Sequence, residues 1–221
     1  MALTRKTAST ASNGESYLTP AELRQPADAL GPRAQRTITS IVKATREVFL
    51  TRGYSGTTIN EIARLADVSR ASFYTYFPSK REVLLAVGAH AASEAERMIE
   101  KLPDHLGSRA ALRTWVSEYF DLLDIHGSFA FAWTQAAHED EEIRVAGMKR
   151  HLKECKMLAT QLMASTGKHV ADPTPLGVVA FSILERSWNY GQLYAGAVDR
   201  PGLIIQAANG LWGLARQPAS S

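Results

Sequence analysis

Apolar residues recur at three- and four-residue intervals through most of this 221-residue chain, a spacing typical of helices with one buried face. No segment has the two-residue alternation of a strand, and no hairpin turn lies between such segments. The pattern predicts helices at about 36–52, two short helices within 57–80, and longer helices at about 79–101, 109–123, 128–138, 139–166, 174–198 and 201–216. We therefore expect an all-α fold of about nine helices.

Residues 57–80, TTINEIARLADVSRASFYTYFPSK, have the pattern of two short helices joined by a tight turn. Thr57 and Thr58 are suited to opening the first helix, because a hydroxyl oxygen can accept a hydrogen bond from an unpaired N–H at a helix start. Asp67 tolerates a left-handed backbone and Ser69 can cap the second helix. The arrangement predicts a helix-turn-helix, in which the start of the second helix meets the edges of DNA bases.

The same stretch resembles the DNA-binding domain of the tetracycline-repressor (TetR) family of transcriptional regulators. The family pattern is a threonine helix start, I-A-x-x-A-G-V-S and then Y-x-H/Y-F-x-x-K. This chain matches it in register at Thr58, Ile62, Ala63, Ala66, Val68, Ser69, Phe73, Tyr74, Tyr76, Phe77, Lys80 and Leu84. Asp67 stands where the family usually has glycine. The resemblance covers about residues 36–88, and the end of the chain is loosely similar to the ethionamide-activation repressor subgroup.

Three parts are predicted along the chain. Residues 1–33 are rich in Ser, Thr, Ala, Pro and Gly without an apolar period, which predicts a flexible basic arm. The resemblance implies a helix-turn-helix DNA-binding domain at 34–80 and a helical ligand-binding and dimerisation domain at 81–216. Four basic residues of the arm either reach DNA phosphates and the minor groove or carry incidental charge: Arg5, Lys6, Arg24 and Arg33.

The net charge of +3 is divided unevenly along the chain. Residues 1–90 contain 12 Lys and Arg against 7 Asp and Glu, whereas the remainder contains 13 against 15. A basic first part suits a nucleic-acid-binding head. The chain has no run of 18 apolar residues, no apolar signal-peptide core and only one cysteine, Cys155, so we expect a cytoplasmic protein without a disulfide.

Nine residues are assigned to DNA by the resemblance together with helix geometry. Arg70 is the best candidate for base readout, because its planar guanidinium can bond guanine O6 and N7 together. The predicted base-facing neighbours are Ala71, Ser72 and Thr75, and the predicted phosphate contacts are Thr58, Ser69, Tyr74, Tyr76 and Lys80. Packing the small core of the head is the alternative role for the two tyrosines.

Aromatic residues and methionines are frequent after residue 102, which is typical of a pocket between helices, although most such residues are expected to be ordinary core. The predicted ligand-binding set is Trp115, Tyr119, Phe120, Phe129, Trp133, Met148, Trp188, Asn189 and Gln192. Small residues along the last two predicted helices, which form the dimer interface in the family, predict a homodimer. Its two-fold symmetry implies a palindromic operator, with recognition helices about 34–36 Å apart.

These features favour a ligand-responsive DNA-binding regulator, a repressor that releases its operator when a small apolar molecule binds. The alternative is a dimeric architectural DNA-binding protein without an effector. No H-E-x-x-H, C-x-x-C or G-x-S-x-G pattern occurs, so neither an enzyme nor a cofactor is expected. His138 with the acids at 139–142 can be read as a metal site, but a solvated helix start is the favoured interpretation, and no metal is predicted.

Overall fold

The structure is a computed structural model that describes residues 31–164, 167 and 170–216, except for the side chains of residues 128, 130 and 131. Its helices are α1 (Pro32–Arg52), α2 (Ile59–Leu65), α3 (Arg70–Tyr76), α4 (Lys80–Glu100), the 3₁₀ segment η3 (Leu102–His105), α5 (Arg109–Glu139), α6 (Glu141–Ala164), α7 (Thr174–Leu193) and α8 (Arg200–Arg216). No strand occurs in the described ranges, so the all-α prediction is confirmed. None of the described helices is long and apolar enough to cross a bilayer.

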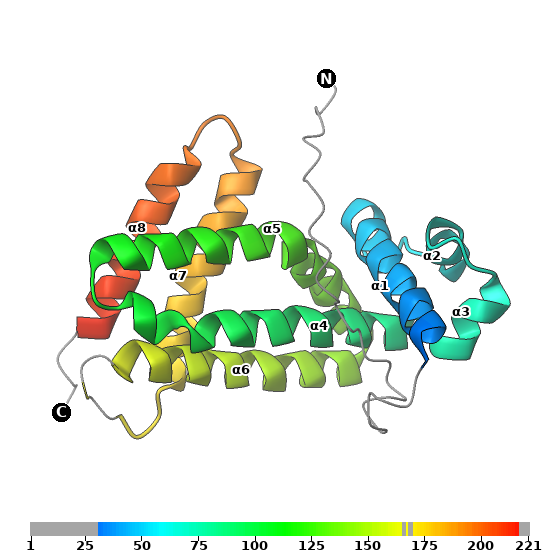
Figure 1. Cartoon of the computed structure of the whole chain (residues 1–221), viewed down its shortest axis with the longest axis horizontal. Helices are drawn as coiled ribbons and strands as arrows, with labels where there is room; N and C mark the ends of the chain where they lie inside the picture. Colours follow the sequence, from blue (N-terminus) through cyan, green and yellow to red (C-terminus); the bar gives the residue numbers. More distant parts are fainter. Residues whose placement is uncertain (1–30, 165–166, 168–169, 217–221) are drawn as a thin grey trace.

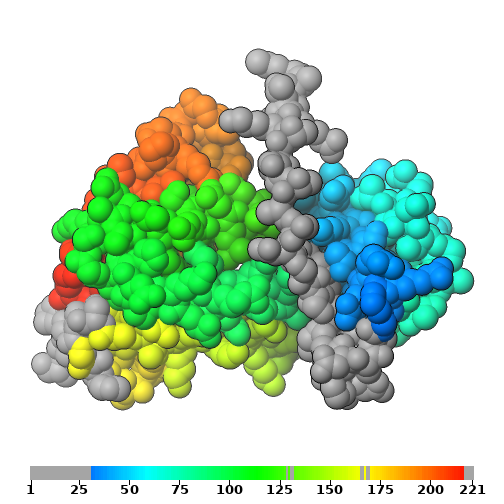
Figure 2. Space-filling view, viewed as in Figure 1, coloured from blue at the N-terminus to red at the C-terminus, as the bar shows by residue number. Residues whose placement is uncertain are grey.

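The helices form a small head and a longer body (Figure 1). Helices α1, α2 and α3 make up the head, which lies at one end of the molecule and is coloured blue to cyan in Figure 2. Helix α4 runs away from the head along the body, packed against α5 and α6, and α7 and α8 stand together at the far end. The first turns of α4 belong to the head core, because Val83, Ala86 and Val87 pack against α1, α2 and α3.

The head begins where the predicted arm ends. Gly31 precedes α1 and Pro32 occupies its first turn, where a missing N–H costs nothing, so the helix starts a few residues earlier than predicted. Arg33 therefore lies exposed in the first turn of α1. The other predicted arm contacts, Arg5, Lys6 and Arg24, lie outside the described residues.

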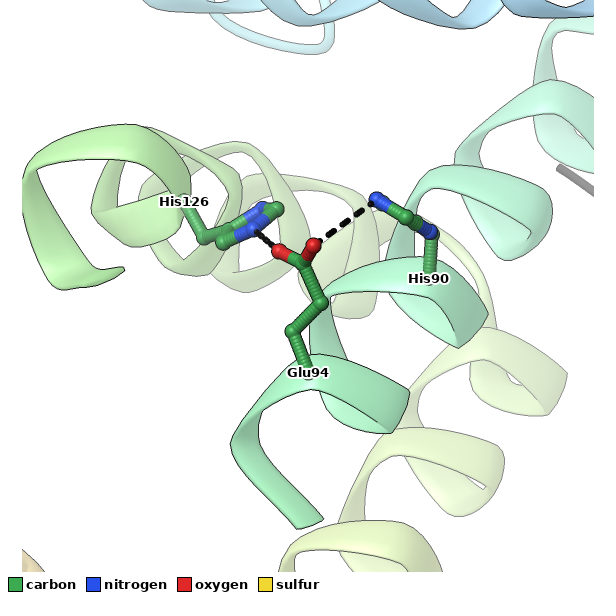
Figure 3. A group of neighbouring side chains, drawn as sticks. All are labelled: His90, Glu94 and His126. Carbon is green, nitrogen blue, oxygen red and sulfur yellow. Dashed lines mark hydrogen bonds and ion pairs between the residues drawn. The ribbon is translucent and has the colours of Figure 1, made fainter. Parts of the chain in front are cut away.

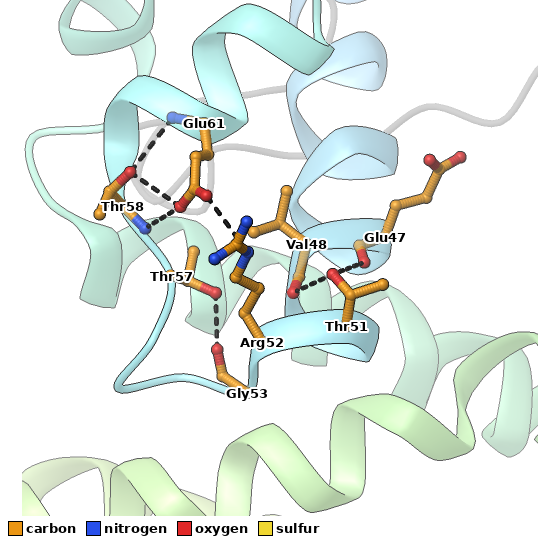
Figure 4. A network of polar contacts seen from close by, with 8 residues as sticks. All are labelled: Glu47, Val48, Thr51, Arg52, Gly53, Thr57, Thr58 and Glu61. Carbon is orange, nitrogen blue, oxygen red and sulfur yellow. Dashed lines mark hydrogen bonds and ion pairs between the residues drawn. The ribbon is translucent and has the colours of Figure 1, made fainter.

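Side-chain caps start both helices of the helix-turn-helix. Thr58 accepts a hydrogen bond from the backbone N–H of Glu61, and the Glu61 carboxylate accepts one from the Thr58 backbone, so the two form a capping box (Figure 4). Arg52 at the end of α1 pairs with the same carboxylate at 3.2 Å. Ser69 caps α3 through the N–H of Ser72. These contacts tie the end of α1 to the start of α2 and cap the start of α3.

The turn between α2 and α3 adopts the left-handed backbone that its sequence requires. Asp67 has a φ of 55°, and among the described residues it is the one non-glycine with a positive φ. Aspartate tolerates this region better than most residues do, because its short side chain can bond locally. The family's usual glycine is therefore replaced without opening the turn, since the Val68 N–H still donates to the Ala63 carbonyl at 3.0 Å.

One helix prediction in the body is wrong. The two helices expected at 109–123 and 128–138 are a single α5 of 31 residues. The predicted gap contains the polar Asp124 and the small Gly127, and tertiary contacts occupy both. The Asp124 carboxylate accepts hydrogen bonds from Trp188, Gln192 and Arg200. A Cβ at Gly127 would overlap the Trp188 ring, so the glycine serves close packing rather than a turn.

Helix α5 also reaches back to the head. The Gln135 amide oxygen accepts a hydrogen bond from the Tyr54 N–H at 2.7 Å, and Glu139 accepts one from the Ser55 hydroxyl at 2.5 Å. Gly53, with a φ of 66°, ends α1 where a Cβ would meet the Gln135 side chain. Head and body are therefore joined covalently through α4 and by hydrogen bonds through α5.

The body core lies between α5, α6, α7 and α8. Trp115 stacks on Tyr119 with ring centroids 5.2 Å apart, and both are almost completely buried. Gly177 of α7 sits directly against the Cys155 backbone of α6, where a Cβ would overlap the carbonyl, so these two helices cross closely. Cys155 itself is completely buried and behaves as a small core residue.

Candidate functional site

The exposed face of α3 presents a positioned arginine. Arg70 is the first residue of the helix, and its guanidinium donates to Asn60 Oδ1 at 3.1 Å and to the Tyr74 hydroxyl at 3.3 Å. The same group lies 5.5 Å from the centre of the Tyr74 ring. Contacts from α2 and from α3 therefore restrict the side chain before any partner arrives. Asn60 was not predicted from sequence, because a polar residue on an exposed helix face gives no distinguishing signal.

The other residues predicted to contact DNA have mixed surroundings. Ala71, Thr75 and Tyr74 are exposed beside Arg70, Ser72 is half-buried, and Tyr76 is half-buried against the head core. The Thr75 hydroxyl donates to the Ala71 carbonyl, and the hydroxyl oxygens of Thr58 and Ser69 accept the capping bonds. Any phosphate contact at Thr58 or Ser69 therefore involves a group that also holds a helix start. All of these roles remain predictions.

Lys80 is bound inside the head to a greater extent than predicted. Its ammonium donates to the Tyr54 carbonyl at 2.8 Å and to the Thr57 carbonyl at 3.2 Å, and it lies 4.3 Å from the centre of the Tyr54 ring. Burial lowers the pKa of this amine. Two of its three N–H donors are thus occupied, which leaves at most one for a phosphate. The side chain primarily ties the start of α4 to the loop between α1 and α2.

A Lys80→Met variant tests this tie. We expect it to lose about 1–3 kcal/mol of unfolding free energy, because two carbonyls lose a charged donor. Urea denaturation measures the change, and Lys43→Met, at an exposed lysine of α1, is the matched control. If Lys80→Met unfolded like the wild type and only bound DNA more weakly, the phosphate contact would be its main role.

A cavity of about 490 Å³ lies between α4, α5, α6 and α7. Small residues of α4 leave the room for it, among them Gly88, Ala89 and Ala92. Its aromatic walls come from α5 and α7, and Met148 of α6 lies exposed at its edge. The volume falls within the range of small-molecule sites.

The cavity includes four of the nine predicted ligand residues: Tyr119, Phe129, Trp133 and Met148. Trp115 and Phe120 are instead core residues, at most 1% exposed, and the Trp115 indole donates to the Met98 carbonyl at 2.8 Å. Trp188 and Gln192 donate to the Asp124 carboxylate and do not line the cavity. Asn189 is exposed on α7, away from the cavity lining. These five residues lie outside the cavity lining, because composition identifies aromatic residues but not the side of the helix they occupy.

Polar residues of the cavity wall were missed. Arg150, His151 and Glu154 of α6 line it together with Glu185 of α7. Burial raises the pKa of Glu154 to about 7, although Arg150, with its Nε 3.6 Å from a Glu154 oxygen, lowers it. The i, i+4 spacing of Arg150 and Glu154 was visible in the sequence, but it also fits a solvated ion pair.

Glu154→Gln should make stability less dependent on pH. The folded-state pKa of about 7 lies above the ordinary glutamate value of 4.5, so ionisation between these values destabilises the fold. We expect the variant to gain about 1–3 kcal/mol over the wild type at pH 8 and nothing near pH 4.5. Thermal unfolding at both pH values measures this, with Glu100→Gln, an exposed acid of α4, as the control. An equal gain at both pH values would contradict the prediction.

The acidic run after His138 is a helix start, as expected. Asp140 accepts hydrogen bonds from the N–H groups of Glu142 and Ile143 and so caps α6. Glu142 pairs with Arg81, and Glu141 pairs with Arg144. Asp140 also lies 3.6 Å from Arg81, so these carboxylates pair with two arginines and with backbone N–H groups at the start of α6.

A helix-turn-helix head with an exposed arginine at the start of α3, joined to a helical body with a cavity, defines a DNA-binding regulatory protein. Residues 41–87 match the family model described as bacterial regulatory proteins, tetR family. These residues of the head are thus a tetR-family DNA-binding domain, and the chain is similar to TetR-family transcriptional regulators.

Individual relatives agree with this assignment. The HTH-type regulator YerO of Bacillus subtilis (strain 168) is 25% identical over 184 residues, covering 77% of this chain and 63% of the relative. EthR of Mycolicibacterium smegmatis is 27% identical over 109 residues, covering 48% and 49%. This chain thus spans less than two thirds of either relative. The solved structure of the fatty acid degradation regulator FadR from Bacillus halodurans aligns with a TM-score of 0.62 at 20% identity, covering 83% of this chain and 96% of that one.

Proposed function

We propose that the chain is a transcriptional repressor that binds a palindromic operator as a homodimer and releases it when a small apolar molecule enters the cavity. The observation that carries the proposal is the path of α4. Val83 and Val87 lie in the head core, and Ala89 and Ala92, less than two turns further on, line the cavity. The same helix therefore packs in the head core and lines the cavity that would hold the ligand.

DNA binding rests on the start of α3. Arg70 is exposed and restrained, and Ala71 and Thr75 beside it are exposed and small enough to let the helix approach a major groove. Lys43, Arg52, Arg64 and Arg70 are exposed basic residues of the head, which suits a phosphate backbone. This arrangement supports base readout by Arg70 and DNA backbone contacts by its neighbours.

Dimerisation through α7 and α8 is supported by their exposed apolar side chains. Val178, Val179, Tyr190 and Leu193 of α7 are each at least 39% exposed, and Leu193 reaches 67%. The end of this helix pair projects beyond α5 in Figure 1. A second copy packed on this face would form a four-helix interface and set the spacing of the two heads.

A Val179→Glu variant should elute as a monomer in size-exclusion chromatography with light scattering, because it places a charge on this exposed apolar face.

The cavity walls suit a ligand with an apolar body. Tyr119, Phe129, Trp133 and Phe181 supply aromatic surface, while Glu154 and His151 offer a small number of polar groups for orientation. The structural relative named a fatty acid degradation regulator supports an acyl-chain-like or similarly apolar effector. Binding would favour an α4 position in which the two heads no longer match the operator.

An operator selected from random DNA makes the proposal testable. A thermal-shift screen of apolar compounds identifies a stabilising ligand, and a gel-shift titration then measures operator affinity with and without it. The proposal expects the ligand to weaken operator binding, and Trp133→Ala to reduce this response. If a stabilising ligand left operator affinity unchanged, induction would be wrong. If no compound stabilised the protein while DNA still bound, the architectural alternative would be favoured.

A further inference from the structure

Three side chains of the kind that bind transition metals converge beside the cavity. His90 and Glu94 lie one turn apart on α4, and His126 of α5 faces them (Figure 3). One donor atom from each of the three side chains lies within 4.8 Å of the donors of the other two. None of these residues belongs to the DNA-binding face, and the ligand mechanism proposed above does not require them to bind an ion.

The spacing of the donor atoms is close to that of a metal site. The His90 Nε2 lies 3.5 Å from one Glu94 oxygen, and the His126 Nε2 contacts the other. Donors around a tetrahedral Zn²⁺ lie roughly 3.3 Å apart when the bonds are 2.0–2.1 Å long. Small rotations of the Glu94 side chain would bring all three donors around one ion. We propose that His90, Glu94 and His126 form a binding site for a divalent first-row transition metal ion.

The surroundings of His126 favour coordination. Its side chain is 6% exposed, and its Nδ1 is buried without a hydrogen-bond partner among the described residues. The unpartnered nitrogen is Nδ1 and not the Nε2 that faces Glu94, so it marks an incompletely satisfied ring and not the position of the ion. The Nε2 of the same ring is directed at Glu94, so the nitrogen that would bind the ion already faces the other donors.

The side chains of Arg46 and Arg97 lie near the site and would repel a bound metal ion, but their own contacts and exposure limit this repulsion. The Arg46 guanidinium donates to the Ile125 carbonyl at 3.2 Å, which holds it against the backbone next to His126. Arg97 lies 3.7 Å from a Glu94 oxygen, but its side chain is 58% exposed and can turn into solvent. Two neutral imidazoles and one carboxylate are the donor set of many zinc enzymes and of non-haem iron sites.

The site would have a consequence for the cavity. Three protein ligands leave at least one coordination position open, as in metal sites that accept a further ligand. His126 lines the cavity, so an ion held there would lie at its wall. The site would also bridge α4 and α5, the two helices that connect the body to the head.

Metal titration of the untagged, chelator-treated full-length chain tests the site without DNA or effector. Isothermal calorimetry with Zn²⁺ should give one site per chain. Adding Co²⁺ should produce the visible absorption bands of a Co²⁺ ion with a low coordination number. We expect Glu94→Gln and His90→Gln each to weaken Zn²⁺ binding at least ten-fold. The control is His138→Ala, at an exposed histidine of α5 outside the cluster, which should bind like the wild type.

Each outcome decides the assignment. A His126→Ala variant would remove a buried ring and could unfold the protein. The test therefore uses Glu94→Gln and His90→Gln, together with the shift in melting temperature of the wild type on adding Zn²⁺. Wild-type protein without stoichiometric Zn²⁺ binding would show that the three residues form only a hydrogen-bonded ion-pair cluster. Wild-type affinity in both Glu94→Gln and His90→Gln would place any bound metal elsewhere. Neither result would bear on operator binding or on the apolar effector.

Discussion

Replacing Arg70 with alanine is expected to lower operator affinity by about 1–3 kcal/mol and to relax the preference at one base-pair position. The reason is the position of the guanidinium at the exposed start of α3, where Asn60 and Tyr74 hold it at 3.1 and 3.3 Å. A restrained side chain loses less conformational entropy when it binds a base. Fluorescence anisotropy with the selected operator, and with each single-base-pair change, measures both effects.

Two companion variants separate base readout from charge. Asn60→Ala removes one support of the guanidinium and should cost less affinity than Arg70→Ala while keeping the same base preference. Arg113→Ala, at an exposed arginine of α5 in the body, should leave binding unchanged. If Arg70→Ala weakened every sequence equally and reduced the salt dependence, Arg70 would be a phosphate contact instead.

Trp115→Ala should be the most destabilising of the single substitutions considered for this protein, at about 3–5 kcal/mol of unfolding free energy. The side chain is completely buried in the body core, stacks on Tyr119 and donates to the Met98 carbonyl. Removing it leaves a cavity and an unpaired carbonyl at the end of α4. Urea denaturation followed by circular dichroism measures the loss.

The matched comparison is Trp133→Ala, a half-buried tryptophan that lines the cavity. It should cost less stability than Trp115→Ala and more of the affinity for an apolar ligand. Were Trp115→Ala to keep its stability while losing the ligand, the sequence-based assignment of Trp115 to the pocket would be right and its role as a core residue wrong.

The head was predictable because local rules decide it. The hydroxyl caps at Thr58 and Ser69 and the turn at Asp67 depend on neighbours within three or four residues, and each forms as expected. The buried face of α1 could be predicted from the periodic spacing of its apolar residues alone. Sequence reasoning therefore placed the helix-turn-helix and its exposed arginine correctly without knowing the body.

The body was less predictable because distant contacts decide it. Asp124 and Gly127 have low helix propensity, yet contacts from Trp188 and Arg200 keep α5 continuous through them. The same limitation affects the cavity. Trp115 and Trp133 are the same residue type on one helix, and only the packing of α6 and α7 determines which one borders empty space.

The double connection between head and body has a consequence for engineering chimeric regulators. A head from this chain could be moved onto the body of a tetR-family regulator to give a hybrid protein. A cut after α3 would remove Val83 and Val87 from the transplanted head core. A cut beyond Val87 would keep them, but the recipient's own α5 would still have to supply an acceptor for the Tyr54 N–H in place of Gln135. Under the induction proposed above, exchange at the nominal domain boundary should therefore give hybrids that respond poorly to a ligand, and co-transfer of the residue at position 135 should restore the response.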